Sequence, residues 1–168
     1  MAHPLVLALF PTPAAAAAGA RALHALGVAR EQISVVSRNH EEAGALAEQM
    51  DASPGADIED SRAAARLGEL GGLVVAAMAL VLPGIGPIVT AGPMSADLGE
   101  AAGHAAGGVA SVLSQAGVPD TTAATLQDAV EHGSVLLGVH VTAGDPGAVT
   151  EALRASGASR TDAATWPD

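Results

Sequence analysis

Apolar and polar positions along the opening part of the chain predict a strand, a helix, a second strand and a further helix. Residues 5–10 form a continuous apolar run of the length of a buried strand. An alanine-rich helix is expected from Pro13 and should end before Gly27, because glycine is a common helix stop. Residues 32–37 are rich in β-branched side chains and predict the second strand, whereas residues 41–50 have helical spacing.

The last part of the chain repeats this pattern. A helix is expected from Pro119 to His132, followed by a strand over residues 134–141. A further helix is predicted over residues 146–155, and an edge strand over residues 161–165.

The two ends of the chain look like copies of one another. Residues 22–27 align with residues 152–157, and the same offset brings the preceding strands into register without a gap. Two βαβ-like halves of this kind form an α+β fold, the ferredoxin-like split βαβ sandwich, with helices on one face of a four-stranded antiparallel sheet. This is the fold that the sequence predicts.

The predicted organisation has four segments within one structural domain. Residues 1–50 form the first half with its following helix, and residues 51–60 form an acidic linker. Residues 61–116 form an apolar, Gly/Ala-rich helical hairpin inserted between the halves, and residues 117–168 form the second half. A chain of 168 residues has the size of a single domain.

The inserted hairpin is exceptionally apolar. Between Leu70 and Pro119 the only formally charged residues are Asp97 and Glu100. Residues 70–82 have no polar face, which predicts a helix that is buried on all sides or lies in lipid. Proline ends a helix, so the turn is expected immediately afterwards. The residues assigned to this turn are Pro83, Gly84, Gly86 and Pro87.

Small residues recur at helical spacing in both predicted helices of the hairpin. Such stripes let a neighbouring helix approach backbone to backbone. Each glycine inside a helix costs roughly 1 kcal/mol relative to alanine, so close packing has to offset the loss. The predicted interface for helix packing or self-association comprises Gly68, Gly72, Ala76, Gly99, Gly103, Gly107 and Ser111.

Three environments can bury this hairpin: the core of the protein, a second copy of the chain, or a lipid bilayer. A membrane span needs roughly 20 apolar residues, and the stretch is long enough. However, Pro83 and Pro87 break it, and it has no tryptophan or tyrosine belt. We therefore expect burial within the protein or a homo-oligomer, with membrane association as the alternative.

Composition excludes several classes of function. The formal net charge is −11, with 18 acidic residues against 7 basic ones, so a phosphate backbone is repelled. One tryptophan, one phenylalanine and no tyrosine leave no platform for base stacking, and nucleic-acid binding is not expected. There is no cysteine, which excludes disulfides and thiolate metal sites and suits a cytoplasmic location.

No catalytic constellation is found in the sequence. The Gly84-Ile85-Gly86 run lacks the third glycine of a dinucleotide-binding loop, because Val89 occupies that place. No G-x-S-x-G elbow is present. The histidines lack the spacing of a metal site and are each interpreted as structural or solvated. They are His3, His24, His40, His104, His132 and His140. The sequence therefore predicts no enzyme activity, no cofactor and no metal.

Short motifs occur in a distinctive order along nearly the whole chain. They are ISVVSR at 33–38, LPGIGPIV at 82–89, AGP at 91–93, GVP at 117–119 and GSVLL at 133–137. In this order they resemble the bacterial general stress protein family, the heat-induced stress protein (YflT-like) domain. Members of that family tend to carry an acidic helix with an aromatic residue after the Gly-x-Pro, which the DTTAA at 120–124 lacks. The resemblance implies a stress-induced protein and supplies no catalytic residues.

The sequence thus predicts a non-enzymatic general stress-response protein that self-associates through the small-residue hairpin. Two alternatives stay open. One is a membrane-associated stress protein that inserts the same hairpin. The other is a small-ligand-binding regulatory domain that uses the sheet face or an interface between the halves, an interpretation that rests on fold analogy.

Overall fold

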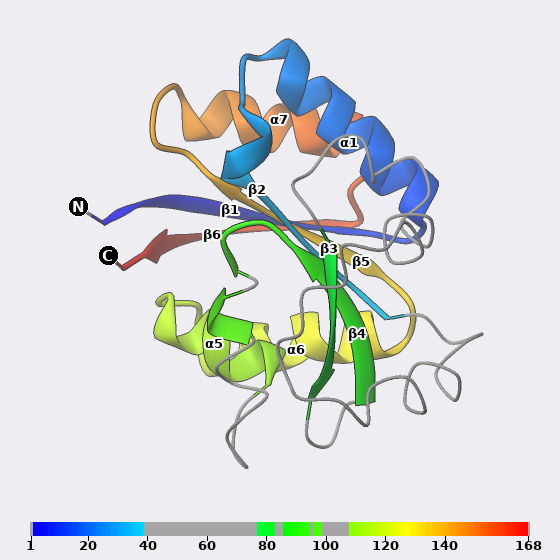
Figure 1. Ribbon diagram of the computed structural model, residues 1–168. Helices are drawn as coiled ribbons and strands as arrows, with labels where there is room; N and C mark the ends of the chain where they lie inside the picture. The colour runs from blue at the N-terminus through cyan, green and yellow to red at the C-terminus, as the bar shows by residue number, and fades with distance from the viewer. Residues whose placement is uncertain (1, 39–76, 83–85, 95, 99–107, 168) are drawn as a thin grey trace.

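The computed structural model describes residues 2–38, 77–82, 86–94, 96–98 and 108–167. They form one antiparallel sheet in the order β3-β4-β2-β5-β1-β6, with helices on both faces (Figure 1). The strands are β1 (His3–Phe10), β2 (Ile33–Ser37), β3 (Ala77–Leu82), β4 (Gly86–Ala91), β5 (Val135–His140) and β6 (Arg160–Trp166). The helices are α1 (Pro13–Ala25), α5 (Val109–Gln115), α6 (Asp120–Glu131) and α7 (Pro146–Ala155), and η1 (Arg30–Gln32) is a 3-10 turn.

The two halves predicted from the sequence are present as β1–α1–β2 and β5–α7–β6. Their helices start and stop with the same local devices. The side chains of Thr12 and Asp145 cap α1 and α7 by accepting hydrogen bonds from backbone N–H groups of the first turn. Gly27 and Gly157 follow the two helices with φ of +84° and +99°, a conformation that favours glycine. The α+β class and the antiparallel sheet are confirmed.

Alternate residues of the strands face opposite sides of the sheet and build two apolar cores. On one side, β1, β2 and β5 pack against α1 and α7. On the other side, the remaining positions of the same strands pack against α5 and α6, through residues that include Leu113 and Leu126. Figure 1 shows the two helix pairs on opposite faces. The sequence predicted helices on one face alone; the second face carries Leu5, Leu7 and Leu9, so it also has to be covered.

The alanine-rich helix α1 lies close to β1 because its contact face carries only small side chains. Ala16, Ala17 and Ala20 are fully buried there. A Cβ atom at Gly19 would lie only 2.6 Å from Cζ of Phe10, the single phenylalanine of the chain. The aromatic ring therefore occupies the space that a side chain at position 19 would need.

The predicted helix over residues 70–82 is wrong for its described part. Residues 77–82 form β3, which pairs with β4 from Ala77↔Ala91 to Leu82↔Gly86. A short apolar run between turn residues fits a buried strand as well as a buried helix, and periodicity cannot separate the two. Gly86 and Pro87 are consequently the first residues of β4 and not turn residues, in keeping with the tolerance for proline at a strand start.

Most of the predicted small-residue interface lies outside the described residues. This applies to Gly68, Gly72, Ala76, Gly99, Gly103 and Gly107, and to the turn residues Pro83 and Gly84. The predicted helix at 41–50 and the acidic linker at 51–60 also lie outside them. Ser111 is described: it lies in α5, half-buried. None of the described helices combines the length and apolarity needed to cross a bilayer.

Candidate functional site

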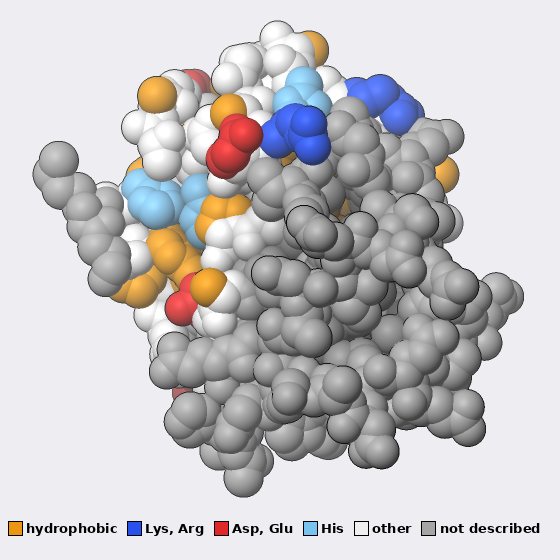
Figure 2. All heavy atoms as spheres, viewed as in Figure 1, with side chains coloured by type: hydrophobic (Ala, Val, Ile, Leu, Met, Phe, Trp, Pro, Cys, Tyr) orange, Lys and Arg blue, Asp and Glu red, His pale blue; other side chains and the backbone are white. Residues whose placement is uncertain are grey.

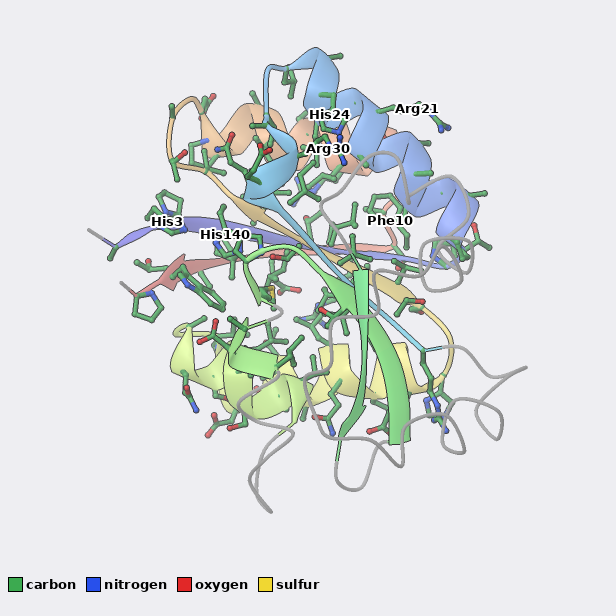
Figure 3. All side chains as sticks on the ribbon, viewed as in Figure 1. His3, Phe10, Arg21, His24, Arg30 and His140 are labelled. Carbon is green, nitrogen blue, oxygen red and sulfur yellow. The ribbon has the colours of Figure 1, made fainter. Side chains whose placement is uncertain are left out.

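A chain of hydrogen-bonded polar side chains crosses the α5/α6 face of the sheet at one end. Nε2 of His3 lies 2.9 Å from Nδ1 of His140, and Nε2 of His140 lies 3.1 Å from Oγ of Ser34. Oγ of Ser34 in turn accepts a hydrogen bond of 3.0 Å from the backbone N–H of Met94. Ser34 is fully buried and His140 is 3% exposed. Figure 3 shows His3 and His140 side by side where β1 begins and β5 ends.

Strand register brings these side chains together from three separate strands. Leu5 pairs with His140, and Ser34 pairs with Gly138 two positions before it. Because side chains alternate between the faces of a sheet, His140, Ser34 and His3 all point to the same face. Gly138 leaves room above the sheet for Met94, whose Sδ would lie 2.7 Å from a Cβ atom at position 138.

His140 is neutral at pH 7. Burial, and to a smaller extent the electrostatic interaction with the neighbouring His3, lowers its pKa from 6.5 to about 4. One ring nitrogen therefore donates and the other accepts. Since Ser34 already accepts from Met94, the arrangement that uses every group has Ser34 O–H donating to Nε2 of His140, and Nδ1–H of His140 donating to His3. These proton positions are assigned from the hydrogen-bond network.

Trp166 connects this polar chain to a hollow at the surface. Its indole ring stands nearly edge-on to His140, with ring centroids 5.0 Å apart and an interplanar angle of 76°. The same tryptophan lines a hollow of about 130 Å³ between the end of β6 and α5. The lining residues are Asp97, Val112, Gln115, Ala116, Trp166 and Pro167. In Figure 2, histidine surface adjoins apolar surface on the side where Figure 1 places both chain ends.

Both walls of the hollow are attached to the buried polar chain. On one wall, Trp166 packs against His140. On the other wall, Asp97 belongs to a helical turn that begins at Met94, and the N–H of Met94 is held by Ser34. The hydrogen-bonded chain therefore fixes the positions of both walls of the hollow.

The order Ser34–His140–His3 resembles a nucleophile, a base and an orienting group, but the geometry does not support nucleophilic catalysis. Ser34 is fully buried and does not line the hollow, so its hydroxyl cannot meet a substrate. The third group is an imidazole and not the carboxylate that usually orients the base. Within the described part of the chain, no three His, Asp or Glu side chains gather in a way that could hold a metal ion.

The sequence did not predict this site. The spacing of the histidines predicts that His3 and His140 are separate structural or solvated residues, because they are 137 positions apart. The sequence feature that could have indicated the site is a polar residue in each of two largely apolar strands. These residues are Ser34 in β2 and His140 at the end of β5. His24 and His132 each bond a carbonyl oxygen near their own helix end, of Val28 and Asp128 respectively. His40 and His104 lie outside the described residues.

Comparison of the chain with protein-family models, with curated proteins and with solved structures found no match. The stress-protein resemblance therefore stays a prediction from the order of the sequence motifs.

Proposed function

We propose that the protein is a non-enzymatic domain that binds a small ligand in the hollow beside Trp166, on a ferredoxin-like framework. In this proposal the framework consists of the strand order β2-β5-β1-β6 with α1 and α7 on one face, which is the arrangement of two interlocked βαβ halves. β3, β4, α5 and α6 are additions to it, and α5 supplies one wall of the hollow.

The observation that carries this proposal is that the buried chain of His3, His140 and Ser34 holds both walls of the hollow in place. Through the ring contact of Trp166 with His140 and the hydrogen bond of Met94 to Ser34, both walls are attached to the buried polar chain. A chance surface depression has no reason to be attached in this way, whereas binding sites are positioned by a rigid second layer. The lining also has the usual character of a ligand site, with apolar Val112 and Ala116 beside a few polar groups. A volume of about 130 Å³ corresponds to roughly four water molecules, so the ligand or its anchoring group is small.

Intrinsic fluorescence provides a direct test of ligand binding. The chain has one tryptophan and no tyrosine, so the emission reports Trp166 alone. Titration with choline, with the neutral 3,3-dimethylbutan-1-ol and with acetate is expected to give a saturable change with at least one probe. The variant Gln115→Phe should weaken that binding by about tenfold or more, since an aromatic ring at this exposed position of the lining fills the entrance.

A matched control for this variant is Ala124→Phe. It adds the same ring at an exposed position of α6 that does not line the hollow, so affinity should stay at the wild-type value. Equal weakening by both variants would contradict the assignment of the hollow.

Self-association is a second candidate, and the position of β3 favours it. This strand lies at the end of the described strand order and pairs only with β4 there. Its sequence, AMALVL, has no charge or proline to discourage pairing with another edge. We propose that β3 of one copy pairs with β3 of a second copy.

The general stress-response role that the motif order implies stays a prediction alongside either candidate.

Light scattering after gel filtration tests this pairing, and the expected mass is twice the chain mass of 16.3 kDa. Successive N–H groups of an edge strand point alternately toward its partner and away from it. Of the two variants Ala79→Pro and Leu80→Pro, one should therefore keep the fold and become monomeric, and the other should disturb pairing with β4. A monomeric wild-type protein would rule out the pairing.

A further inference from the structure

The lining of the hollow has a definite electrostatic character. Asp97 brings a carboxylate to it, and the other lining residues that the structure describes are all uncharged. Among the residues that the structure describes, Asp97 makes no ion pair, hydrogen bond or other electrostatic contact. A half-buried carboxylate without a partner beside the apolar Val112 and Ala116 favours a cation that can replace its lost hydration.

Trp166 adds a second attraction for positive charge. The ring quadrupole of an indole attracts ammonium groups, and tryptophan is the most effective of the aromatic residues in this respect. His140, which packs against this ring, is neutral at pH 7, so it places no competing positive charge there. The net charge of −11 also attracts cations and repels anions at long range.

We infer that the hollow binds a small organic cation, an ammonium or methylated ammonium group, between the carboxylate of Asp97 and the indole of Trp166. This inference rests on the proposed ligand-binding function and names the chemical class of the ligand. A trimethylammonium group has about the number of heavy atoms that the volume admits. Any remainder of the ligand extends past Gln115, which is exposed.

Choline and 3,3-dimethylbutan-1-ol test this inference, because they share a shape and differ in charge. Choline should produce a saturable change in Trp166 fluorescence, with calorimetry giving the same dissociation constant, at an affinity about tenfold or more above that of the neutral alcohol. Acetate at equal ionic strength should give no binding.

The variant Asp97→Asn keeps the shape of the side chain and removes its charge. It should weaken choline binding by about tenfold while leaving the affinity for the neutral alcohol unchanged. Glu151→Gln is the matched control: it changes the net charge equally, at an exposed position of α7 on the opposite face of the sheet, and should have no effect. Thermal unfolding of each variant verifies the fold.

The outcomes separate this inference from the proposed function. If the neutral alcohol or acetate binds as tightly as choline, or if Asp97→Asn leaves choline binding unchanged, the cation assignment is overturned and ligand binding in the hollow stands. If none of the three probes gives a saturable signal, both the assignment and the proposed function are contradicted.

Discussion

Replacement of Gly92 by alanine is expected to lower the free energy of unfolding by about 3 kcal/mol. Gly92 follows β4 and has a φ of +87°, which strains any side chain with a Cβ atom. That atom would also lie 2.1 Å from the carbonyl oxygen of Ile33 and 2.6 Å from Cα of Ser34. Both contacts are with the backbone of β2, which cannot move aside without disturbing the sheet. Urea unfolding followed by circular dichroism measures the loss.

Gly157→Ala separates the two causes. Gly157 has a similar φ of +99°, but nothing lies within 4 Å of a Cβ atom there. Replacement of Gly157 by alanine should lower the free energy of unfolding by only about 1 kcal/mol, because backbone strain is then the sole cause. Equal losses for the two variants would mean that the contact between Gly92 and β2 is not as close as the structure has it. The contact matters for the site because Ser34 and Met94 lie on either side of it.

Acidification from pH 7 to pH 4 is expected to destabilise the protein by about 2 kcal/mol through His140 alone. Burial, together with the neighbouring His3, depresses the pKa of His140 to about 4, against 6.5 for an ordinary histidine. Between these values the unfolded chain binds more protons than the folded one, so stability is fully present above pH 6.5 and is lost as the pH falls toward 4. The loss at pH 4 is smaller than the full difference in pKa would give, because His140 of the folded protein is itself only about half protonated at that pH.

The structure explains what protonation of His140 would disturb. A cation there lies against His3, which is the one titratable side chain among the described residues that is hydrogen-bonded to it. The protonated ring can no longer accept a hydrogen bond from the hydroxyl of Ser34. Ser34 and Trp166 face it from β2 and β6 without charge. The tether from Ser34 to Met94, which positions one wall of the hollow, is therefore weakened together with the fold.

Urea unfolding between pH 4 and pH 8 measures this effect by comparison with His140→Gln. That variant lacks the titrating ring and should show a shallower fall of stability below pH 6.5. His132→Gln removes a histidine whose side chain is 75% exposed, at the end of α6, and should follow the wild-type curve. An identical pH dependence for wild type and His140→Gln would show that protonation of His140 does not change the free energy of unfolding.

The candidate site could not be predicted from the sequence, for a physical reason. Its polar chain joins three strands, and the contact between His3 and His140 spans 137 positions. No local spacing encodes such a contact, because it depends on register across the sheet. In the sequence, Asp97 is one of two charges in an apolar stretch and Trp166 is a rare aromatic residue. Their meeting at one hollow depends on how β6 and α5 pack.

The sequence by itself determined the two βαβ halves and helix α6. Their signals are local: Thr12 and Asp145 cap the helices, and Gly27 and Gly157 follow their ends. Only the tertiary structure decided that residues 77–82 form β3, because an apolar run of this length satisfies a helix and a strand equally and pairing with β4 selects the strand. Tertiary structure also decided the covering of the second face and the assembly of the hollow, since both require contacts between segments far apart in the chain.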